Sequence, residues 1–176
     1  MTKDSEVPDP IETAKQLGRL AMECQRRGDL GEAEVKLREA VGLGRARPGL
    51  YHGDHLGELA WLVANSGDLN GASLLYREAL DVEVATGGDG AVAVARHFLA
   101  EHLMRMESYE EVVGVLTEAV ELRPVHRVTL ARCHEAMGDL EAARRQADLA
   151  IAGTSDSEQE TNIRGLLGEL AGAGEP

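Results

Sequence analysis

The stretch RRGDLGEAEVKLREAV (26–41) decides how the rest of the chain is interpreted. It joins a Gly-Asp-Leu triplet to a helical pattern in which Ala33 and Ala40 stand seven residues apart. The stretches NSGDLNGASLLYREAL (65–80) and AMGDLEAARRQADLAI (136–151) repeat this arrangement. Self-similarity at a period of about 20–50 residues is typical of repeat architectures. The first prediction is therefore a chain of structural repeats.

Aligning the chain on these turns brings small residues together at three places in each of four copies. The third copy along the chain has Glu107 where the others have glycine. Eleven of the twelve small-residue positions are alanine, which suits close crossings of helix axes because larger side chains would hold the axes apart. The three columns are Ala21, Ala60, Ala100 and Ala131; Ala33, Ala72, Val112 and Ala143; and Ala40, Ala79, Ala119 and Ala150. Beside the first column a leucine fills the gap in each copy, at Leu20, Leu59, Leu99 and Leu130.

The turns themselves predict helix hairpins. Gly28, Gly67 and Gly138 permit a sharp backbone bend at the end of a first helix. The aspartate that follows each glycine can cap the second helix. One hairpin cannot bury its apolar faces alone, so neighbouring hairpins are expected to stack into a solenoid.

Composition limits the classes of function. The chain has 176 residues and a net charge of −13, which argues against nucleic acids and anionic membranes as main partners. No apolar run reaches the length of about 20 residues that a membrane-spanning helix needs. The first ten residues contain no apolar segment of a secretory signal, so a cytoplasmic protein is expected. Cys24 and Cys133 lie within helical patterns and are expected to be buried thiols.

The aligned alanines resemble the tetratricopeptide repeat (TPR) family, whose units of 34 residues carry small residues at the eighth, twentieth and twenty-seventh places. The resemblance covers about residues 14–152. Successive turns lie 39, 40 and 31 residues apart, and the longer units are similar to the kinesin-light-chain-like subclass. The resemblance implies an all-α, right-handed α-solenoid of four TPR-type hairpins with a C-terminal capping helix. It also implies that Asp54 and Asp89 cap helices.

Two departures from the family concern packing. Arg96 and Arg127 stand where the family has an aromatic residue at its fourth place, and we expect their stems to lie over apolar surface. The helix after the fourth repeat carries an apolar stripe, which either covers the last repeat or docks onto another chain. The expected division is a flexible N-terminal arm (1–10), repeats within 11–152 (about 14–47, 51–86, 90–123 and 124–152), a capping helix (157–171) and a tail (172–176).

Nothing in the sequence predicts catalysis. The six histidines form no His-Glu-x-x-His motif, and the two cysteines form no Cys-x-x-Cys pair. Cys133 and His134 are adjacent, so on a helix they point in different directions and make no catalytic dyad. We therefore expect no catalytic residue, no metal and no cofactor.

The resemblance implies that the first helix of each repeat lines a concave groove. The only tryptophan and the only phenylalanine, Trp61 and Phe98, map to this groove, as do four arginines of an otherwise acidic chain. Aromatic anchors bordered by arginines suit a peptide or protein segment that carries apolar and acidic residues. The candidate binding residues are Arg19, Met22, Arg26, Glu58, Trp61, Asn65, His97, Phe98, Met104, Arg105 and Arg132.

Three hypotheses about function follow. The leading one is a non-enzymatic interaction module or scaffold that holds a protein or peptide ligand in the groove. The second is a self-associating structural protein, a homodimer joined through the C-terminal stripe or an end face. The third is a regulatory sensor subunit acting on another chain, which rests on analogy with the family alone.

Overall fold

The computed structural model describes residues 9–49, 51–86, 88–119, 122–155 and 157–168. Within these ranges the chain forms helices and no strand, so the predicted all-α repeat fold is confirmed. The helices are α1 (Pro10–Arg26), α2 (Leu30–Ala46), α3 (His52–Asn65), α4 (Leu69–Thr86), α5 (Asp89–Arg105), α6 (Tyr109–Thr117), α7 (Pro124–Ala136), α8 (Leu140–Ala152) and α9 (Ser157–Leu167).

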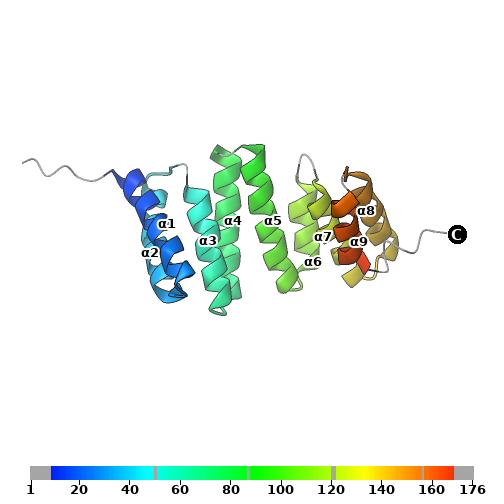
Figure 1. Cartoon of the computed structure of the whole chain (residues 1–176), viewed down its shortest axis with the longest axis horizontal. Coiled ribbons are helices and arrows are strands. Elements are labelled where there is room, and N and C mark those ends of the chain that lie inside the picture. The colour runs from blue at the N-terminus through cyan, green and yellow to red at the C-terminus, as the bar shows by residue number, and fades with distance from the viewer. Residues whose placement is uncertain (1–8, 50, 87, 120–121, 156, 169–176) are drawn as a thin grey trace, which may run out of the picture. The chain divides into compact units, whose positions relative to one another are not determined.

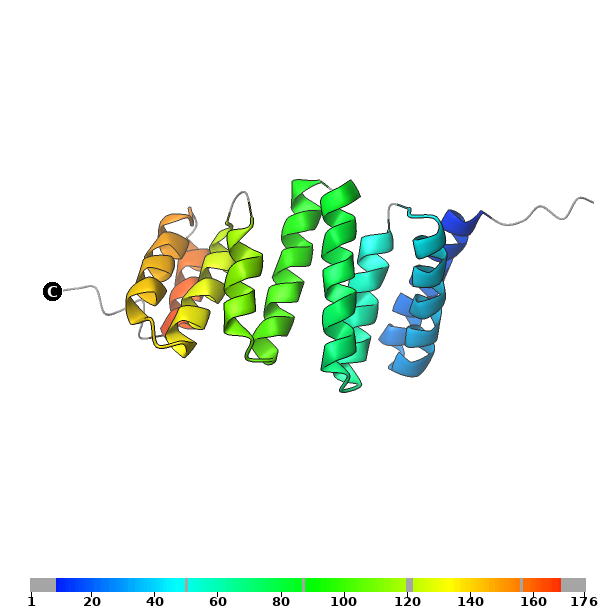
Figure 2. The ribbon, with the colours of Figure 1, turned by 180° about the vertical axis from the view of Figure 1, so that it is seen from behind.

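The chain divides into two compact units, and the division falls within α5. Unit 1 comprises residues 1–95 and unit 2 residues 96–176. In unit 1, α1 packs on α2, α2 on α3 and α3 on α4. Helices α1 and α3 face the viewer in Figure 1, and α2 and α4 face the viewer from behind in Figure 2, so unit 1 has two layers. In unit 2, α7 contacts α6, α8 and α9.

Both ends of the expected division fall partly outside the described residues. Residues 1–8 of the predicted arm lie outside them, whereas Asp9 caps α1 by accepting a hydrogen bond from the backbone N–H of Ile11 at 3.2 Å. The predicted capping helix is described as far as Gly168, and α9 spans Ser157–Leu167. The predicted tail, 172–176, is not among the described residues.

Four turns share one backbone geometry. Gly28, Gly67 and Gly138 have positive φ angles of 82°, 100° and 82°. Each glycine N–H donates to the carbonyl three residues earlier, and the next N–H donates to the carbonyl five residues earlier, as for Asp68 to Val63 at 3.2 Å. This arrangement pairs carbonyl groups that the helix end leaves unpaired.

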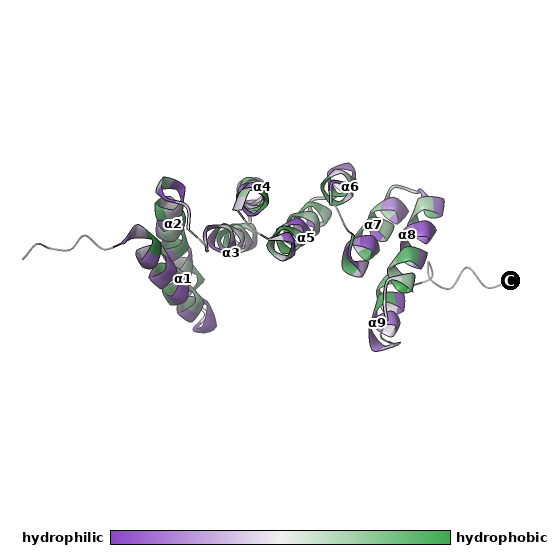
Figure 3. Ribbon diagram, turned by 90° about the horizontal axis from the view of Figure 1, so that it is seen from above, coloured by the Kyte–Doolittle hydropathy of each residue, from purple (hydrophilic) through white to green (hydrophobic). Residues whose placement is uncertain are grey.

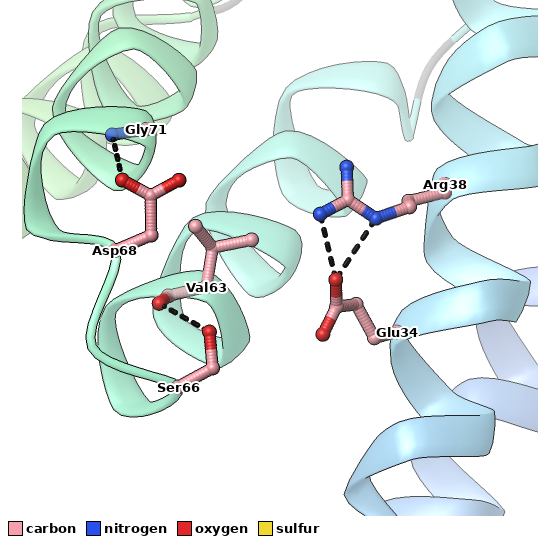
Figure 4. Close-up of polar contacts among 6 residues, drawn as sticks. All are labelled: Glu34, Arg38, Val63, Ser66, Asp68 and Gly71. Atoms are coloured by element: carbon pink, nitrogen blue, oxygen red, sulfur yellow. Dashed lines mark hydrogen bonds and ion pairs between the residues drawn. The ribbon is translucent and has the colours of Figure 1, made fainter.

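The aspartates after these glycines cap the second helices, as predicted. Asp68 Oδ1 accepts a hydrogen bond from Gly71 N–H at 2.8 Å, and Ser66 donates to the Val63 carbonyl at 2.8 Å (Figure 4). Asp29 and Asp139 cap α2 and α8 in the same way. The expected caps Asp54 and Asp89 were wrong: α3 begins at His52 and α5 at Asp89, so both carboxylates lie inside the first helical turn. There they favour the helix dipole without acting as caps.

Glu107 takes the place of the glycine in the third hairpin and adopts its conformation. Its φ is 57°, and it is the only non-glycine with positive φ among the described residues. A side chain in this left-handed region costs about 1 kcal/mol. Glu107→Gly is therefore expected to raise the free energy of unfolding of unit 2 by about 0.5–1 kcal/mol, measured by urea denaturation.

Gly138→Ala is the reciprocal variant and should lower that free energy by about 1 kcal/mol, because no described residue lies within 4 Å of the added methyl group and only the backbone conformation opposes it. Equal stability of Glu107→Gly and the parent protein would contradict the strain assigned to Glu107.

The alanine columns occupy the helix crossings. Ala21, Ala60, Ala100 and Ala131 are all 0% exposed, and Val112 fills its place in the second column equally well. Ala119 is the exception: α6 ends at Thr117, so Ala119 lies beyond the helix and is half-buried. Leu20 also departs from its column, because it is 46% exposed while Leu59 is 2% exposed. Among the described residues no helix precedes α1, whereas α2 precedes α3 and packs on it.

The fourth-place arginines join the two helices of their hairpins. Arg96 of α5 donates to the Val115 carbonyl of α6 at 2.6 Å, and its side chain is only 11% exposed. Arg127 of α7 donates to Gln146 of α8 at 3.3 Å. In these two hairpins a hydrogen bond between helices stands where the family packs an aromatic ring.

Helix α9 covers the last hairpin of unit 2. Ile163 and Leu167 are buried in one apolar cluster with residues of α7 and α8, including Val128 and Ala147. Leu166, on the same helix, is 61% exposed. Two of the stripe's apolar side chains are thus used within the chain.

Candidate interaction surfaces

The first candidate surface belongs to unit 1 and comprises Arg19, Met22 and Arg26 of α1 with Glu58, Trp61 and Asn65 of α3. On each helix the three residues follow a spacing of i, i+3 and i+7, which keeps them on one face. Seen from above, α1 and α3 lie on the same side of unit 1 (Figure 3). We call this set the unit 1 surface.

Large apolar side chains are open to solvent on the unit 1 surface. Met22 is 51% exposed and Trp61 46%. Arg19, Arg26 and Asn65 are exposed beside them. Trp61 is therefore not buried between helices.

Glu58 differs from its neighbours on the unit 1 surface because it is half-buried. Its Oε2 atom is buried and has no hydrogen-bond partner within the described residues. Burial raises the pKa of the Glu58 carboxyl, and the nearby Asp54 raises it further. A carboxyl in this state gains from a hydrogen bond supplied by an incoming molecule.

The second candidate surface belongs to unit 2 and comprises His97, Phe98, Met104 and Arg105 of α5 with Arg132 of α7; we call it the unit 2 surface. Phe98 is 51% exposed and lies at a centroid distance of 5.8 Å from the ring of His97. His97 is half-buried and also lies beside His126 of α7, with the ring centroids 6.1 Å apart. Phe98 is thus the open apolar group of this surface.

Met104 is turned partly into the protein. Its Sδ atom lies 3.0 Å from Sγ of Cys133 on α7, and its side chain is half-buried. Burial raises the pKa of the Cys133 thiol to about 11, with a smaller contribution from Glu101. The thiolate, which is the nucleophilic form of cysteine, is therefore rare near neutral pH. The prediction that Cys24 and Cys133 are buried thiols is confirmed.

The arginines of both surfaces have no carboxylate partner among the residues that the structure describes. Arg19, Arg26, Arg105 and Arg132 make no hydrogen bond or ion pair within the described residues. Several arginines of the second helices do: Arg38 with Glu34, Arg45 with Glu78 and Arg145 with Glu141. Arg144 of α8 is an exception, since it too is unpaired within the part of the chain that the structure describes.

Solved structures similar to this chain share its arrangement of helices. The crystal structure of a Podosopora anserina putative kinesin light chain with nearly identical TPR-like repeats is 20% identical, covers 95% of this chain and 89% of its own, and has a TM-score of 0.72. BtubC (BKLC) from P. vanneervenii is 20% identical over 94% of this chain and 79% of its own, with a TM-score of 0.68. The fold is that of TPR-like repeats.

A third similar structure is MamA (41-end) from Desulfovibrio magneticus RS-1, which is 17% identical, covers 94% of this chain and 98% of its own, and has a TM-score of 0.64. Neither a family model nor a curated protein matches the sequence. The predicted resemblance to kinesin-light-chain-like repeats is thus confirmed for the fold. The second helices of the first two hairpins are the long ones, with 17 residues in α2 and 18 in α4 against 9 in α6.

The described ranges of this TPR-like chain hold no group of three or more histidine, cysteine, aspartate or glutamate side chains placed to bind a metal. No helix in those ranges has the length and apolar composition needed to cross a bilayer. Sequence reasoning missed the exposed apolar side chains of the second helices, Val35 at 62% and Leu74 at 70%. Their common place, two residues after the alanine of the second column, was the available signal.

Proposed function

We propose that this TPR-like chain is a non-enzymatic protein-interaction scaffold whose two surfaces bind protein or peptide segments carrying apolar and acidic residues. TPR-like repeats in the similar structures suggest an interaction scaffold in general terms. The observation that carries the finer proposal is the coincidence of half-exposed aromatic side chains with unpaired arginines on the first helices of the described hairpins. Aromatic and arginine side chains supply most of the energetically dominant contacts in protein interfaces.

Charge supports an acidic partner. The chain carries a net charge of −13, so an acidic segment is repelled by most of its surface. The four arginines of the two surfaces are local positive charges on this negatively charged chain. They are unpaired within the described ranges, so each can form a new ion pair without first losing one. Binding to them orients an acidic segment over Trp61 or Phe98.

The test uses a defined probe. Peptides of about 12 residues, long enough to span three turns of helix, are selected by display against the full chain and measured by fluorescence polarisation with the parent protein and single variants. For a peptide that binds unit 1, Trp61→Ala is expected to raise the Kd by about 30-fold, equivalent to about 2 kcal/mol. Leu74→Ala, a matched control on α4 with 70% exposure, should leave the Kd unchanged.

The same comparison for unit 2 pairs Phe98→Ala with Leu149→Ala of α8, which is 46% exposed. Circular dichroism confirms that each variant keeps its helical content. If the selected peptides are basic or lose affinity only with Leu74→Ala or Leu149→Ala, the proposed surfaces and ligand class are wrong.

A further inference from the structure

Two histidines lie buried between the two hairpins of unit 1. His52 is the first residue of α3 and is 4% exposed; His55, one turn later, is 7% exposed. His52 lies against Gly44 of α2, where a methyl group added to the glycine would be 2.2 Å from the imidazole Nδ1. His55 lies against Gly18 of α1, where such a methyl group would be 2.2 Å from Nε2. We call these four residues the histidine seam.

The seam accommodates neutral imidazoles. Nδ1 of His52 is buried and has no hydrogen-bond partner within the described residues. A protonated imidazole donates from both ring nitrogens and needs an acceptor at each. At the seam, Nδ1 of His52 and Nε2 of His55 each face a glycine Cα, which accepts no hydrogen bond. A charge on either ring would therefore be offset only in part, by Glu78 for His52 and by Asp54 for His55.

The charged groups around the seam are mostly paired with one another, and Asp54 is the exception. Asp54 of α3 lies next to His55, and the ring of Tyr51, the N-cap of α3, is tilted against the imidazole with a centroid distance of 6.4 Å. The cations of the neighbouring elements form ion pairs with other carboxylates. Lys15 pairs with Glu12 on α1, and Arg45 of α2 pairs with Glu78 of α4. Arg47, which follows α2, pairs with Asp9, which precedes α1.

These surroundings set the direction of titration. Burial lowers the pKa of His52; Glu78 raises it and Arg45 lowers it by smaller amounts. Burial also lowers the pKa of His55, against a raising effect of Asp54 and with a further lowering by His52. Both imidazoles therefore take up protons more readily when the seam is open.

We propose that the histidine seam is an acid-sensitive joint, at which protonation of His52 and His55 releases α1 and α2 from α3. The inference goes beyond the proposed function and does not depend on any ligand. Once released, α1 and α2 form a lone hairpin, which cannot bury its apolar faces by itself. Helices of this length are marginal without tertiary packing, so the released segment frays.

The expected pH window follows from the sign of the shifts. Above the unfolded pKa of about 6.5, both histidines are neutral in the open and closed states and the seam keeps its full stability. As the pH falls below that value, the open state binds protons first, so the opening equilibrium rises by up to about tenfold per pH unit for each histidine. The raised pKa values of Glu58 and Glu83 have the opposite effect, because their protonation on acidification favours the folded state.

Hydrogen exchange of the full chain at about pH 7.5 and about pH 5.5, on either side of the unfolded pKa and corrected for intrinsic exchange rates, tests the joint. In the parent protein, the opening equilibrium of α1 and α2 is expected to rise by about 5-fold to 100-fold at the lower pH. Amides of α8 in unit 2 should not change. In the double variant His52→Gln/His55→Gln, the opening equilibrium of α1 and α2 should increase by less than about twofold at the lower pH, because glutamine does not titrate.

His134→Gln is the matched control: this histidine lies in unit 2, with Nδ1 4.0 Å from Asp139, so its loss should leave the response of α1 and α2 intact. Unchanged protection of α1 and α2 in the parent protein overturns the proposal, as does a full response in the double glutamine variant. If that variant does not fold, NMR titration of the parent decides. Apparent pKa values of both imidazoles below about 6.5, accompanied by loss of hydrogen-exchange protection in α1 and α2, support the proposal. Apparent pKa values of about 6.5 or higher, with that protection retained, overturn the proposal.

Discussion

Replacing Gly44 with alanine is expected to lower the free energy of unfolding of unit 1 by about 2 kcal/mol. The new Cβ would lie 2.2 Å from Nδ1 of His52 and 2.8 Å from its Cγ and Cε1 atoms. His52 is 4% exposed, so its ring can move away from the new methyl group only by disturbing the packing around it. The loss would reverse the usual effect of this substitution, because alanine in a helix is ordinarily about 1 kcal/mol more favourable than glycine.

Gly42→Ala provides the control within the same helix. Gly42 is exposed, and no atom of the part of the chain that the structure describes lies within 4 Å of an added methyl group, so this variant should gain up to about 1 kcal/mol. The two variants should therefore differ by about 3 kcal/mol in urea denaturation followed by circular dichroism. Adding His52→Ala to Gly44→Ala should recover part of the loss, since it removes the ring that the methyl group meets. Equal stability of Gly44→Ala and Gly42→Ala would contradict the close contact.

Ala131→Leu is expected to lower the free energy of unfolding of unit 2 by about 3 kcal/mol. Ala131 is 0% exposed and lies in one cluster with Val128, Ala147 and Ile163, so a leucine has to displace α8 or α9. A loss of this size is a large part of the stability of a typical domain, about 5–15 kcal/mol.

Ala136→Leu tests whether the cost of Ala131→Leu comes from packing or from leucine itself. Ala136 is the last residue of the same helix and is exposed, so its substitution should change the stability by less than about 0.5 kcal/mol. Thermal and urea unfolding of both variants give the comparison. If Ala131→Leu changes the stability by no more than Ala136→Leu does, the helices at Ala131 are packed less closely than the zero exposure of this residue indicates.

The sequence predicts the register of the hairpins because a close crossing of helices accepts few residue types. Close packing restricts the residue type at Ala60 and Ala131, and the left-handed backbone restricts it at Gly67. Each restriction is therefore visible in the sequence as the same residue type at the same position of the repeats. Glu107 shows the strength of that signal: the alignment put it in a glycine position, and the chain bends there as at the glycines.

The histidine seam could not be predicted in the same way. It pairs Gly18 with His55 and Gly44 with His52, and these contacts occur only once among the hairpins that the structure describes. A repeat alignment reveals what the copies share and hides what one copy has alone. The extent of α6 was missed for a related reason, since the expectation for Ala119 came from the other hairpins, whose second helices are longer.

The candidate surfaces could be predicted in part. The position of a residue in its repeat correctly placed Trp61 and Phe98 on exposed faces. It could not show that Met104 contacts Cys133 or that Glu58 buries one carboxylate oxygen, because both depend on side-chain conformations. Nor could it show which arginines are paired, since Arg45 meets a carboxylate 33 residues further along the chain.

The common geometry of the four turns has a consequence for how such a chain changes in length. Each turn closes with bonds between its own residues, so it requires nothing from distant parts of the sequence. A gene duplication or deletion that begins at one such turn and ends at another keeps the hydrogen bonds of both turns, so the carbonyl groups at the new helix ends still have their partners. These bends are thus natural breakpoints for evolutionary gain or loss of a whole module.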